Sequence, residues 1–180
     1  MNRIMGVLTL KAPVYREIAE DQNATTTAAI IVAVIALVAG IVGAVALPAT
    51  LSFLPPEVQA QVPNASPIKY ALNVIIGALL AWFVGSWIFA FVSKTFLGGK
   101  TNTGEMLRVF GYTNLFSILL IIPCCGLFAA TILSVIGAII GIREAAEIST
   151  GKAILTGIAG LIGVWVVQWG VGQIINFLPF

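Results

Sequence analysis

The chain has 180 residues, of which 59% are hydrophobic and only 9% are charged. Because an ordinary soluble domain has about 25% charged residues, a fold in water could not bury this much apolar surface, and the bilayer must be the solvent. The net charge of +2 and the absence of a Lys/Arg cluster argue against nucleic-acid binding.

The first segment, residues 1–26, is too polar to cross a bilayer. Apolar residues recur at helical spacing between Ile4 and Ile18, with basic residues among them. Pro13 divides the segment and can begin its second helix. We therefore predict one or two short amphipathic helices on the cytoplasmic leaflet, where anionic lipid attracts Lys and Arg; the alternative is a loose lead-in to the first span. A cleavable signal peptide is not expected, because acidic residues precede the first apolar run.

The next two charge-free runs are long enough for membrane helices, which need about 20 mostly apolar residues. The first span is predicted at about 28–47, with a threonine of Thr25–Thr27 as N-cap and Pro48 as its end. The second span is predicted at about 69–92, and the glycine pair at 98–99 should end its helix. The proline-rich loop between these spans should be extended or rich in turns.

The third apolar run, Val109–Ile142, is too long for a single span. As one helix its 34 residues would reach about 51 Å, whereas the hydrocarbon core is about 30 Å thick. The sequence Pro-Cys-Cys-Gly at 123–126 combines a helix breaker with a permissive glycine. We therefore predict a tight hairpin with spans at about 107–122 and 126–142, followed by a last span at about 153–177.

The basic residues set the orientation of these five helices. With the N-terminus in the cytoplasm, eight of the nine Lys and Arg residues lie on the cytoplasmic side, and only Lys69 lies outside. One span in place of the hairpin would move Arg143 and Lys152 outside and change the ratio to six against three. The positive-inside rule therefore favours an all-α, five-span bundle with a cytoplasmic N-terminus and an outside C-terminus. Residues 1–180 would form one membrane domain.

The spans themselves hold few polar residues. Asn114 with Ser117, and Gln168, are the notable ones, and we interpret them as interhelical hydrogen-bonding groups rather than a substrate site. Small residues recur at a spacing of four, which indicates close packing within the bundle or between subunits. Proton- or ion-driven transport usually needs an ionisable group inside a span, and none is found there.

Missing residues exclude several enzyme classes. The chain has no histidine and its single aspartate is Asp21, which excludes serine–histidine, HExxH zinc and paired-aspartate catalysis. The adjacent Cys124 and Cys125 make neither a good disulfide nor a metal site, and we interpret them as small residues beside the outer turn of the hairpin. Gly99-Lys100-Thr101 lacks the preceding glycine and strand of a phosphate loop. We expect no enzyme activity and no cofactor or metal.

Short motifs spread over nearly the whole chain are similar to those of a known family. They are Pro13 and Tyr15 in the first segment, Gly98-Gly99-Lys100, Glu105-Met106-Leu107-Arg108, Phe110-Gly111-Tyr112, Gly-Ile-Arg-Glu-Ala-Ala at 141–146 and Gly151-Lys152-Ala153. On these motifs the chain resembles prokaryotic members of the Yip1 family, which are five-span membrane proteins. The resemblance implies a multi-pass protein of a prokaryotic cell membrane.

The same resemblance bears on partners. Eukaryotic relatives bind Rab-type small GTPases and act in vesicle trafficking, and they carry a long N-terminal region with an acidic DLYGP-like motif and a Gly-Tyr-Gly motif. Here the N-terminal region is short, the acidic motif is absent, and Thr113 follows Gly111 and Tyr112. The resemblance therefore does not extend small-GTPase binding to this chain.

The sequence predicts a non-enzymatic membrane-organising scaffold or adaptor that acts through its cytoplasmic loops. Its partners would be the lipid bilayer and an unknown protein or a second copy of the chain. The alternative is a passive transport component or an accessory subunit of a membrane complex. The candidate partner or lipid contacts lie in the polar segments after the second and fourth spans: Lys100, Glu105, Arg108, Gly111, Tyr112, Arg143, Glu144 and Lys152.

Overall fold

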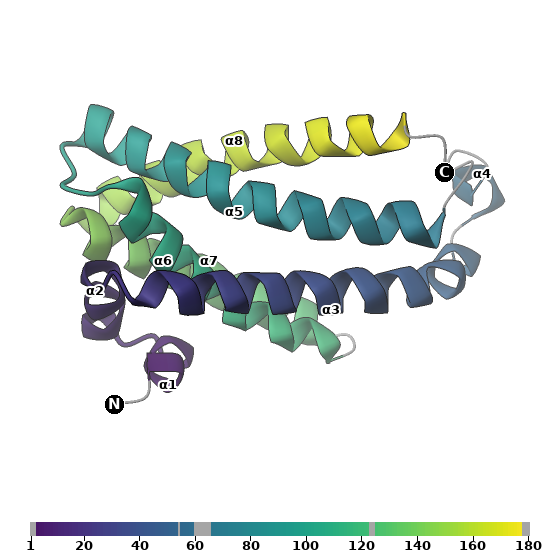
Figure 1. Cartoon of the computed structure of the whole chain (residues 1–180), viewed down its shortest axis with the longest axis horizontal. Coiled ribbons are helices and arrows are strands. Elements are labelled where there is room, and N and C mark those ends of the chain that lie inside the picture. Colours follow the sequence, from purple (N-terminus) through teal and green to yellow (C-terminus); the bar gives the residue numbers. More distant parts are fainter. Residues whose placement is uncertain (1–2, 54, 60–65, 123–124, 178–180) are drawn as a thin grey trace.

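The computed structural model describes the chain apart from residues 1–2, 54, 60–65, 123–124 and 178–180. Every element in this described part is helical (Figure 1). In chain order the helices are α1 (Arg3–Leu8), α2 (Ala12–Glu20), α3 (Ala24–Ser52), α4 (Pro56–Gln59), α5 (Pro67–Leu97), α6 (Thr103–Thr113), the 3₁₀ helix η1 (Asn114–Ile121), α7 (Cys125–Ala146) and α8 (Thr150–Asn176).

Within the described residues, four helices are long and apolar enough to cross a membrane: α3, α5, α7 and α8. At most 28% of the most apolar stretch of each is buried inside the bundle. Their outer faces instead carry large apolar side chains, and Ile41, Phe83 and Leu161 are 58%, 58% and 60% exposed. Such faces are stable against lipid chains and unstable in water. The all-helical class is confirmed, and helices of membrane-spanning length lie over four of the five predicted spans.

The remaining predicted span, at 107–122, is divided between two elements of different pitch. The Thr113 hydroxyl donates to the Val109 carbonyl at 2.9 Å, and the Asn114 amide donates to the Phe110 carbonyl at 3.0 Å. Side chains that bond to the preceding turn compete with the backbone ladder, and the α-helix gives way there to the tighter η1. With rises of about 1.5 and 2.0 Å per residue, α6 and η1 together reach about 32 Å.

The helices are arranged as a bundle of long rods with a hairpin packed against it (Figure 1). Helix α5 packs against α3 and α8, while α7 packs against α6 and η1. The start of α6 and the end of α7 lie at the same end of the bundle as the end of α5 and the start of α8. Helices α1 and α2 lie at this end as well, so the polar segments of the chain meet there.

The N-terminal segment forms the two predicted helices, but the apolar side of α2 faces protein rather than lipid. Tyr15 and Ile18 are 0% exposed, and α2 packs on α6 and α7. Gly137 of α7 leaves room for the tyrosine, because a Cβ atom there would lie 2.9 Å from the Tyr15 hydroxyl oxygen. The main buried cluster of the protein therefore lies at this end of the bundle, where α2 covers it.

The boundaries of the first long helix differ from the prediction. Helix α3 begins one residue before Thr25–Thr27, so none of these threonines is its N-cap, and it continues through Pro48 to Ser52. In apolar surroundings the helix is the conformation that satisfies the neighbouring backbone groups, which outweighs the single hydrogen bond that proline loses. The predicted end of α5 is confirmed, since Gly98 adopts the left-handed φ of 71° that favours glycine.

The loop between α3 and α5 is shorter than predicted because α3 extends into it, and it contains the short helix α4. Of the two cysteines, Cys125 is exposed at the start of α7. Cys124 and Pro123, which were predicted to lie in the turn of the hairpin, are outside the described residues.

Candidate functional site

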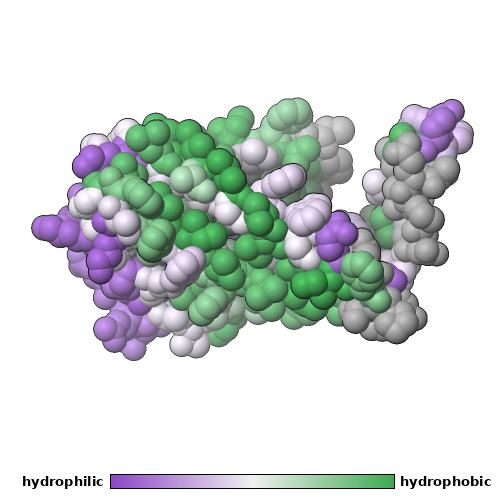
Figure 2. Space-filling view, turned by 90° about the horizontal axis from the view of Figure 1, so that it is seen from above, coloured by the Kyte–Doolittle hydropathy of each residue, from purple (hydrophilic) through white to green (hydrophobic). Residues whose placement is uncertain are grey.

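Charged residues gather at one end of the bundle, which we call the charged end. It comprises α1, α2 and the turn between them, the last turn of α5, the α5–α6 loop, the first half of α6, the end of α7, the α7–α8 turn and the start of α8 (Figure 1). All nine Lys and Arg residues are described, and eight belong to these segments; only Lys69, in the first turn of α5, lies at the opposite end. Figure 2 shows hydrophilic residues at this end beside a broad hydrophobic belt.

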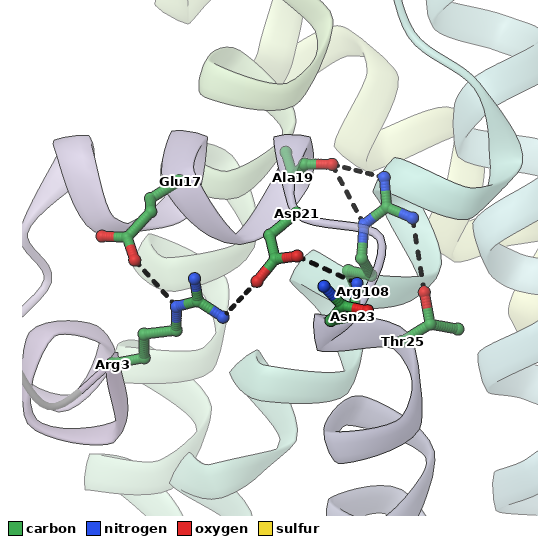
Figure 3. Close-up of polar contacts among 7 residues, drawn as sticks. All are labelled: Arg3, Glu17, Ala19, Asp21, Asn23, Thr25 and Arg108. Carbon is green, nitrogen blue, oxygen red and sulfur yellow. Dashed lines mark hydrogen bonds and ion pairs between the residues drawn. The ribbon is translucent and has the colours of Figure 1, made fainter.

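Arg108 of α6 is buried at the charged end and joins α6 to the N-terminal helices (Figure 3). Its Nε donates to the Ala19 carbonyl oxygen at 3.0 Å, its Nη2 donates to the same oxygen, and its Nη1 donates to Thr25 Oγ1 at 3.3 Å. Ala19 lies in the last turn of α2, where carbonyls have no partner within the helix and the helix dipole favours a cation. Arg108 therefore fixes the end of α2 and the start of α3.

Arg3 of α1 binds two carboxylates beside this junction (Figure 3). Its Nε donates to Glu17 Oε1 at 2.8 Å and its Nη1 donates to Asp21 Oδ2 at 2.7 Å. The backbone N–H of Asn23 donates to the other Asp21 oxygen at 2.9 Å. The hydrogen bond from Arg3 and then the one from Asn23 hold the pKa of Asp21 below its usual value. These contacts attach α1 to the end of α2.

The α5–α6 loop presents the side chain of Lys100 on a fixed backbone. The Gly99 N–H donates to the Ser93 carbonyl, and the Lys100 N–H donates to the carbonyl of Ala146, the last residue of α7, both at 2.9 Å. The Lys100 side chain is nevertheless 84% exposed, and its Nζ lies 3.8 Å from Glu147 Oε2. The loop thus combines a restrained main chain with an available ammonium group.

Glu147 connects this loop to α2. Its carboxylate accepts from Arg16 Nη2 at 2.8 Å, and Arg16 Nε also donates to Glu20 at 3.0 Å. The pKa of Arg16 is raised above its ordinary value, first by the hydrogen bond to Glu20 and then by the charge of Glu147. Glu147 adopts φ 54°, a left-handed conformation that is uncommon outside glycine. This turn ends α7 and turns the carboxylate toward Arg16 and Lys100.

Two further contacts fix the ends of the helices. The Lys152 Nζ donates to the carbonyl of Leu97, the last residue of α5, at 2.8 Å. Arg143 and Glu144 form an ion pair at 2.7 Å at the end of α7. The start of α8 is therefore joined to the end of α5, and neither contact involves a ligand.

A threonine at position 103, just before the third apolar run, is the N-cap that the sequence predicts, but the structure shows that Thr103 is the first residue of α6 and not its cap. Asn102 caps α6, with the Glu105 N–H donating to Asn102 Oδ1 at 3.0 Å and the Asn102 N–H donating to Glu105 Oε2 at 3.3 Å. This capping box satisfies two unpaired N–H groups at once, which a cap at Thr103 would not do.

Three of the predicted contact residues lie inside the protein rather than on its surface. Arg108 and Tyr112 are 7% and 3% exposed, and Gly111 is buried where α6 crosses α3. A Cβ atom on Gly111 would lie 2.9 Å from the Cα of Ala28, so the two backbones approach closely. Of the other predicted residues, the exposed ones are Lys100 and Lys152, and the half-buried ones are Glu105, Arg143 and Glu144.

The basic residues of the charged end divide by type. The four arginines all make hydrogen bonds or ion pairs within the protein. The four lysines are all exposed, and they are Lys11, Lys94, Lys100 and Lys152. The difference is one of degree, because Arg16 is exposed as well and the Lys152 ammonium bonds to the Leu97 carbonyl. A planar guanidinium suits several fixed oxygens at once, whereas a compact ammonium stays largely hydrated.

The sequence did not single out several residues of this site. Arg16 and Glu147 are 131 residues apart, so no local spacing indicates their pairing. The acceptor for Arg108 is a backbone carbonyl, which any residue at position 19 would supply. The exposed Lys94 was recognisable only as part of the polar stretch that follows the second span.

A cavity of about 220 Å³ lies between the end of α5 and the α5–α6 loop. The rings of Trp87 and Phe91 stack at its edge with centroids 5.6 Å apart. Its lining consists of Trp87, Ala90, Phe91, Lys94, Thr95, Thr101, Asn102 and Thr103. An ammonium, several hydroxyls and aromatic rings at the boundary of the belt suit contact with lipid head groups. Within the described part of the chain, no group of three or more His, Cys, Asp or Glu residues could hold a metal ion.

Comparison with known proteins identifies the family. The Yip1 domain family model matches residues 5–172, and the chain belongs to the Yip1 domain family. The resemblance predicted from the short motifs is thereby confirmed over nearly the whole chain, and the protein is a multi-pass integral membrane protein. Neither the comparison with curated proteins nor the comparison with solved structures gave a match.

Proposed function

We propose that this Yip1-domain protein is a non-enzymatic scaffold or adaptor of the prokaryotic cell membrane that binds an acidic protein segment through its charged end. The charged end would face the cytoplasm, with the N-terminus inside and the C-terminus outside. Helix α6 with η1 would be the fifth span. Support comes from the return of the chain to the charged end after α7 (Figure 1), which keeps eight of the nine basic residues on one side.

The observation that carries this proposal is the exposed Lys100 beside the Arg16–Glu147 pair. The Gly99 and Lys100 N–H groups bond to α5 and α7 respectively and restrain this loop, whereas the Lys100 side chain is 84% exposed. A restrained loop loses little conformational entropy when it binds. Lys11 and Lys94 are also exposed at this end, so the surface offers several ammonium groups to a partner with carboxylates.

The test is a cross-linked pull-down from native membranes. The variant Lys11→Gln/Lys94→Gln/Lys100→Gln removes three exposed charges without changing a buried residue. Lys152 is left in place, because its ammonium joins the start of α8 to the end of α5. Lys69→Gln, at the opposite end of the bundle, is the matched control. We expect the variant to recover its main soluble partner at least about tenfold less well, since each lysine contributes on the order of 1 kcal/mol to a charged contact. Equal recovery of all partners by the variant and the wild type would refute the proposal.

A passive transport component is the second candidate function. The observation that favours it is a cavity of about 490 Å³ between α5, α6, η1, α7 and α8, at the depth of the spans. Flux of uncharged solutes into liposomes that contain only this protein would support transport. Equal flux into protein-free liposomes would exclude it.

A further inference from the structure

The larger cavity has the size and lining of a ligand site. Its volume of about 490 Å³ lies within the range of about 300–1,000 Å³ that is typical of small-molecule pockets. Small residues leave this space between the helices: Ala78 and Ala81 of α5, Ala138 of α7 and Gly157 of α8. Most of the remaining lining is aliphatic or aromatic, so the interior suits an apolar ligand.

The cavity opens sideways toward the region of the lipid chains. Val135 of α7 and Ile158 and Leu161 of α8 line it and are 47%, 54% and 60% exposed. These residues therefore form its rim on the outer faces of α7 and α8. A ligand dissolved in the bilayer can enter there without crossing the charged end.

Some polar groups of the lining are bonded within the protein. The Trp82 Nε1 donates to the Leu107 carbonyl at 2.8 Å, which links α5 to α6, and the Ser86 hydroxyl donates to the Trp82 carbonyl at 2.6 Å. The side-chain nitrogen of Asn114 donates to the backbone carbonyl of Phe110, one turn earlier in the chain. The side-chain oxygen of Asn114 is therefore available to a ligand. In the part of the chain that the structure describes, Asn114 does not make the predicted interhelical hydrogen bond.

Three other polar groups of the lining have no such bond. Among the described residues, the hydroxyls of Ser117 and Ser134 and the amide of Gln168 have no hydrogen-bond partner. They come from η1, α7 and α8 and line the same cavity. The Gln168 carbonyl oxygen lies against Gly77 of α5, whose missing side chain admits it. An unpaired polar group is costly in apolar surroundings, so these groups favour a ligand that hydrogen-bonds to them.

Position and charge limit the class of that ligand. Ser134 lies about 18 Å along α7 from the charged end, and Gln168 about 27 Å along α8. These depths fall within the hydrocarbon core, which is about 30 Å thick. No Lys, Arg, Asp or Glu lines the cavity as described. A charged head group at this depth would lack a partner, whereas a hydroxyl, ester or amide would find one.

We propose that the cavity between α5, η1, α7 and α8 is a binding site for a neutral membrane lipid. The apolar chain lies among the alanines and aromatic rings of the lining, and uncharged oxygen-containing groups of the lipid hydrogen-bond to Ser117, Ser134 or Gln168, which line the cavity at different depths. Asn114 adds one acceptor beside them. A phospholipid fits less well, because its head group would remain at the interface and its chains would leave the three polar side chains unpaired.

The experiment uses the full chain in lipid nanodiscs with photoactivatable probes that carry the reactive group in the apolar chain. The neutral probes are a diacylglycerol and a long isoprenoid alcohol, and the charged probe is phosphatidylglycerol. We expect a neutral probe to label lining residues such as Ala138 and Ile158, and unlabelled neutral lipid to compete for this labelling. Comparison of labelling by the diacylglycerol and by the isoprenoid alcohol shows which of these two classes of neutral lipid the cavity binds. Equal labelling of the cavity by phosphatidylglycerol, or labelling that is spread evenly over the exposed faces of α3, would overturn the proposal.

Variants test the polar contacts. In Ser117→Ala/Ser134→Ala/Gln168→Leu, loss of three hydrogen bonds in the bilayer should weaken binding by about tenfold or more. Thr131→Val is the matched control, because its exposed hydroxyl on α7 bonds to Leu127 of the same helix at 2.8 Å. A second variant, Gly157→Phe, should fill the cavity. Thermal unfolding supplies a separate readout, since neutral lipid should raise the Tm of the wild type and the control only. Full binding by both cavity variants would contradict the assignment.

Discussion

Replacing Arg108 with methionine should release the end of α2 from the bundle. Methionine has a similar length but no hydrogen-bond donor, so the Ala19 carbonyl would lose both of its hydrogen bonds from α6. This carbonyl belongs to a residue that is only 2% exposed, so water cannot readily replace them. An unsatisfied buried acceptor costs about 1–3 kcal/mol. Loss of the cation from the C-terminal end of the helix adds about 0.3–1 kcal/mol. Removal of a buried charge offsets part of this sum.

The net expectation is that α2 becomes less stable by about 2–3 kcal/mol, so that it opens about 30- to 140-fold more often. Hydrogen–deuterium exchange of peptides that cover α2 measures this opening in detergent or nanodiscs. Arg143→Met is the control, because Arg143 pairs only with the adjacent Glu144. Exchange in α2 within about threefold of the wild type, once Arg108→Met is shown to be folded, would refute the role of Arg108 as an anchor.

Three further predictions concern packing, pH and topology. Gly111→Ala should lower the Tm and reduce the free energy of unfolding by about 1–3 kcal/mol, because the added methyl group meets the backbone of α3. Gly151→Ala is the control and should leave the Tm unchanged, because a methyl group added there would contact no neighbouring side chain or helix within 4 Å. The depressed pKa of Asp21 means that its bond to the arginine of α1 contributes fully above the ordinary value of 3.8 and is lost as the pH falls through the lower folded value. The mobility of a spin label on α1 should therefore rise only below about pH 4. In Asp21→Asn it should exceed that of the wild type at neutral pH, although the Arg3–Glu17 contact remains. In single-cysteine proteins, an impermeant thiol reagent should reach Cys125 only from outside and Glu147→Cys only from inside; labelling of Cys125 from inside would contradict five spans.

Much of the architecture could be predicted from the apolar runs and the charges between them. A span must be apolar over most of its length, so α3, α5, α7 and α8 leave a plain signal in the sequence. The 3₁₀ geometry of η1 leaves none, because the residues of Asn114–Ile121 are as apolar as those of an α-helical span. The change of pitch falls where Thr113 and Asn114 bond to the preceding turn. Ser86, Thr131 and Thr156 make the same kind of bond inside helices that continue, so such residues do not signal the change in the sequence.

The candidate site was predictable as a region but not residue by residue. Lys100 and Lys152 are exposed as expected for contact residues, whereas Arg108 and Tyr112 are held in the interior by packing with α2 and α3. An amphipathic pattern in residues 1–20 fits an interfacial helix and a helix packed on protein equally well. Only the glycines of α7 that accommodate Tyr15 decide between them, and they lie more than 100 residues away in the sequence.

Counting basic residues predicts which end of the bundle faces the cytoplasm, but it does not predict which of those residues bind a partner. The reason is that arginine and lysine behave differently in the fold. The positive-inside rule treats arginine and lysine alike. The fold does not, because a guanidinium can bind two oxygens in fixed directions, as Arg3 binds Glu17 and Asp21. Arginines that hold helix ends together are occupied before any partner arrives. At the charged end, recognition of an acidic partner therefore falls to Lys11, Lys94 and Lys100. Substitution of Arg108 should change stability, whereas substitution of these lysines should change binding.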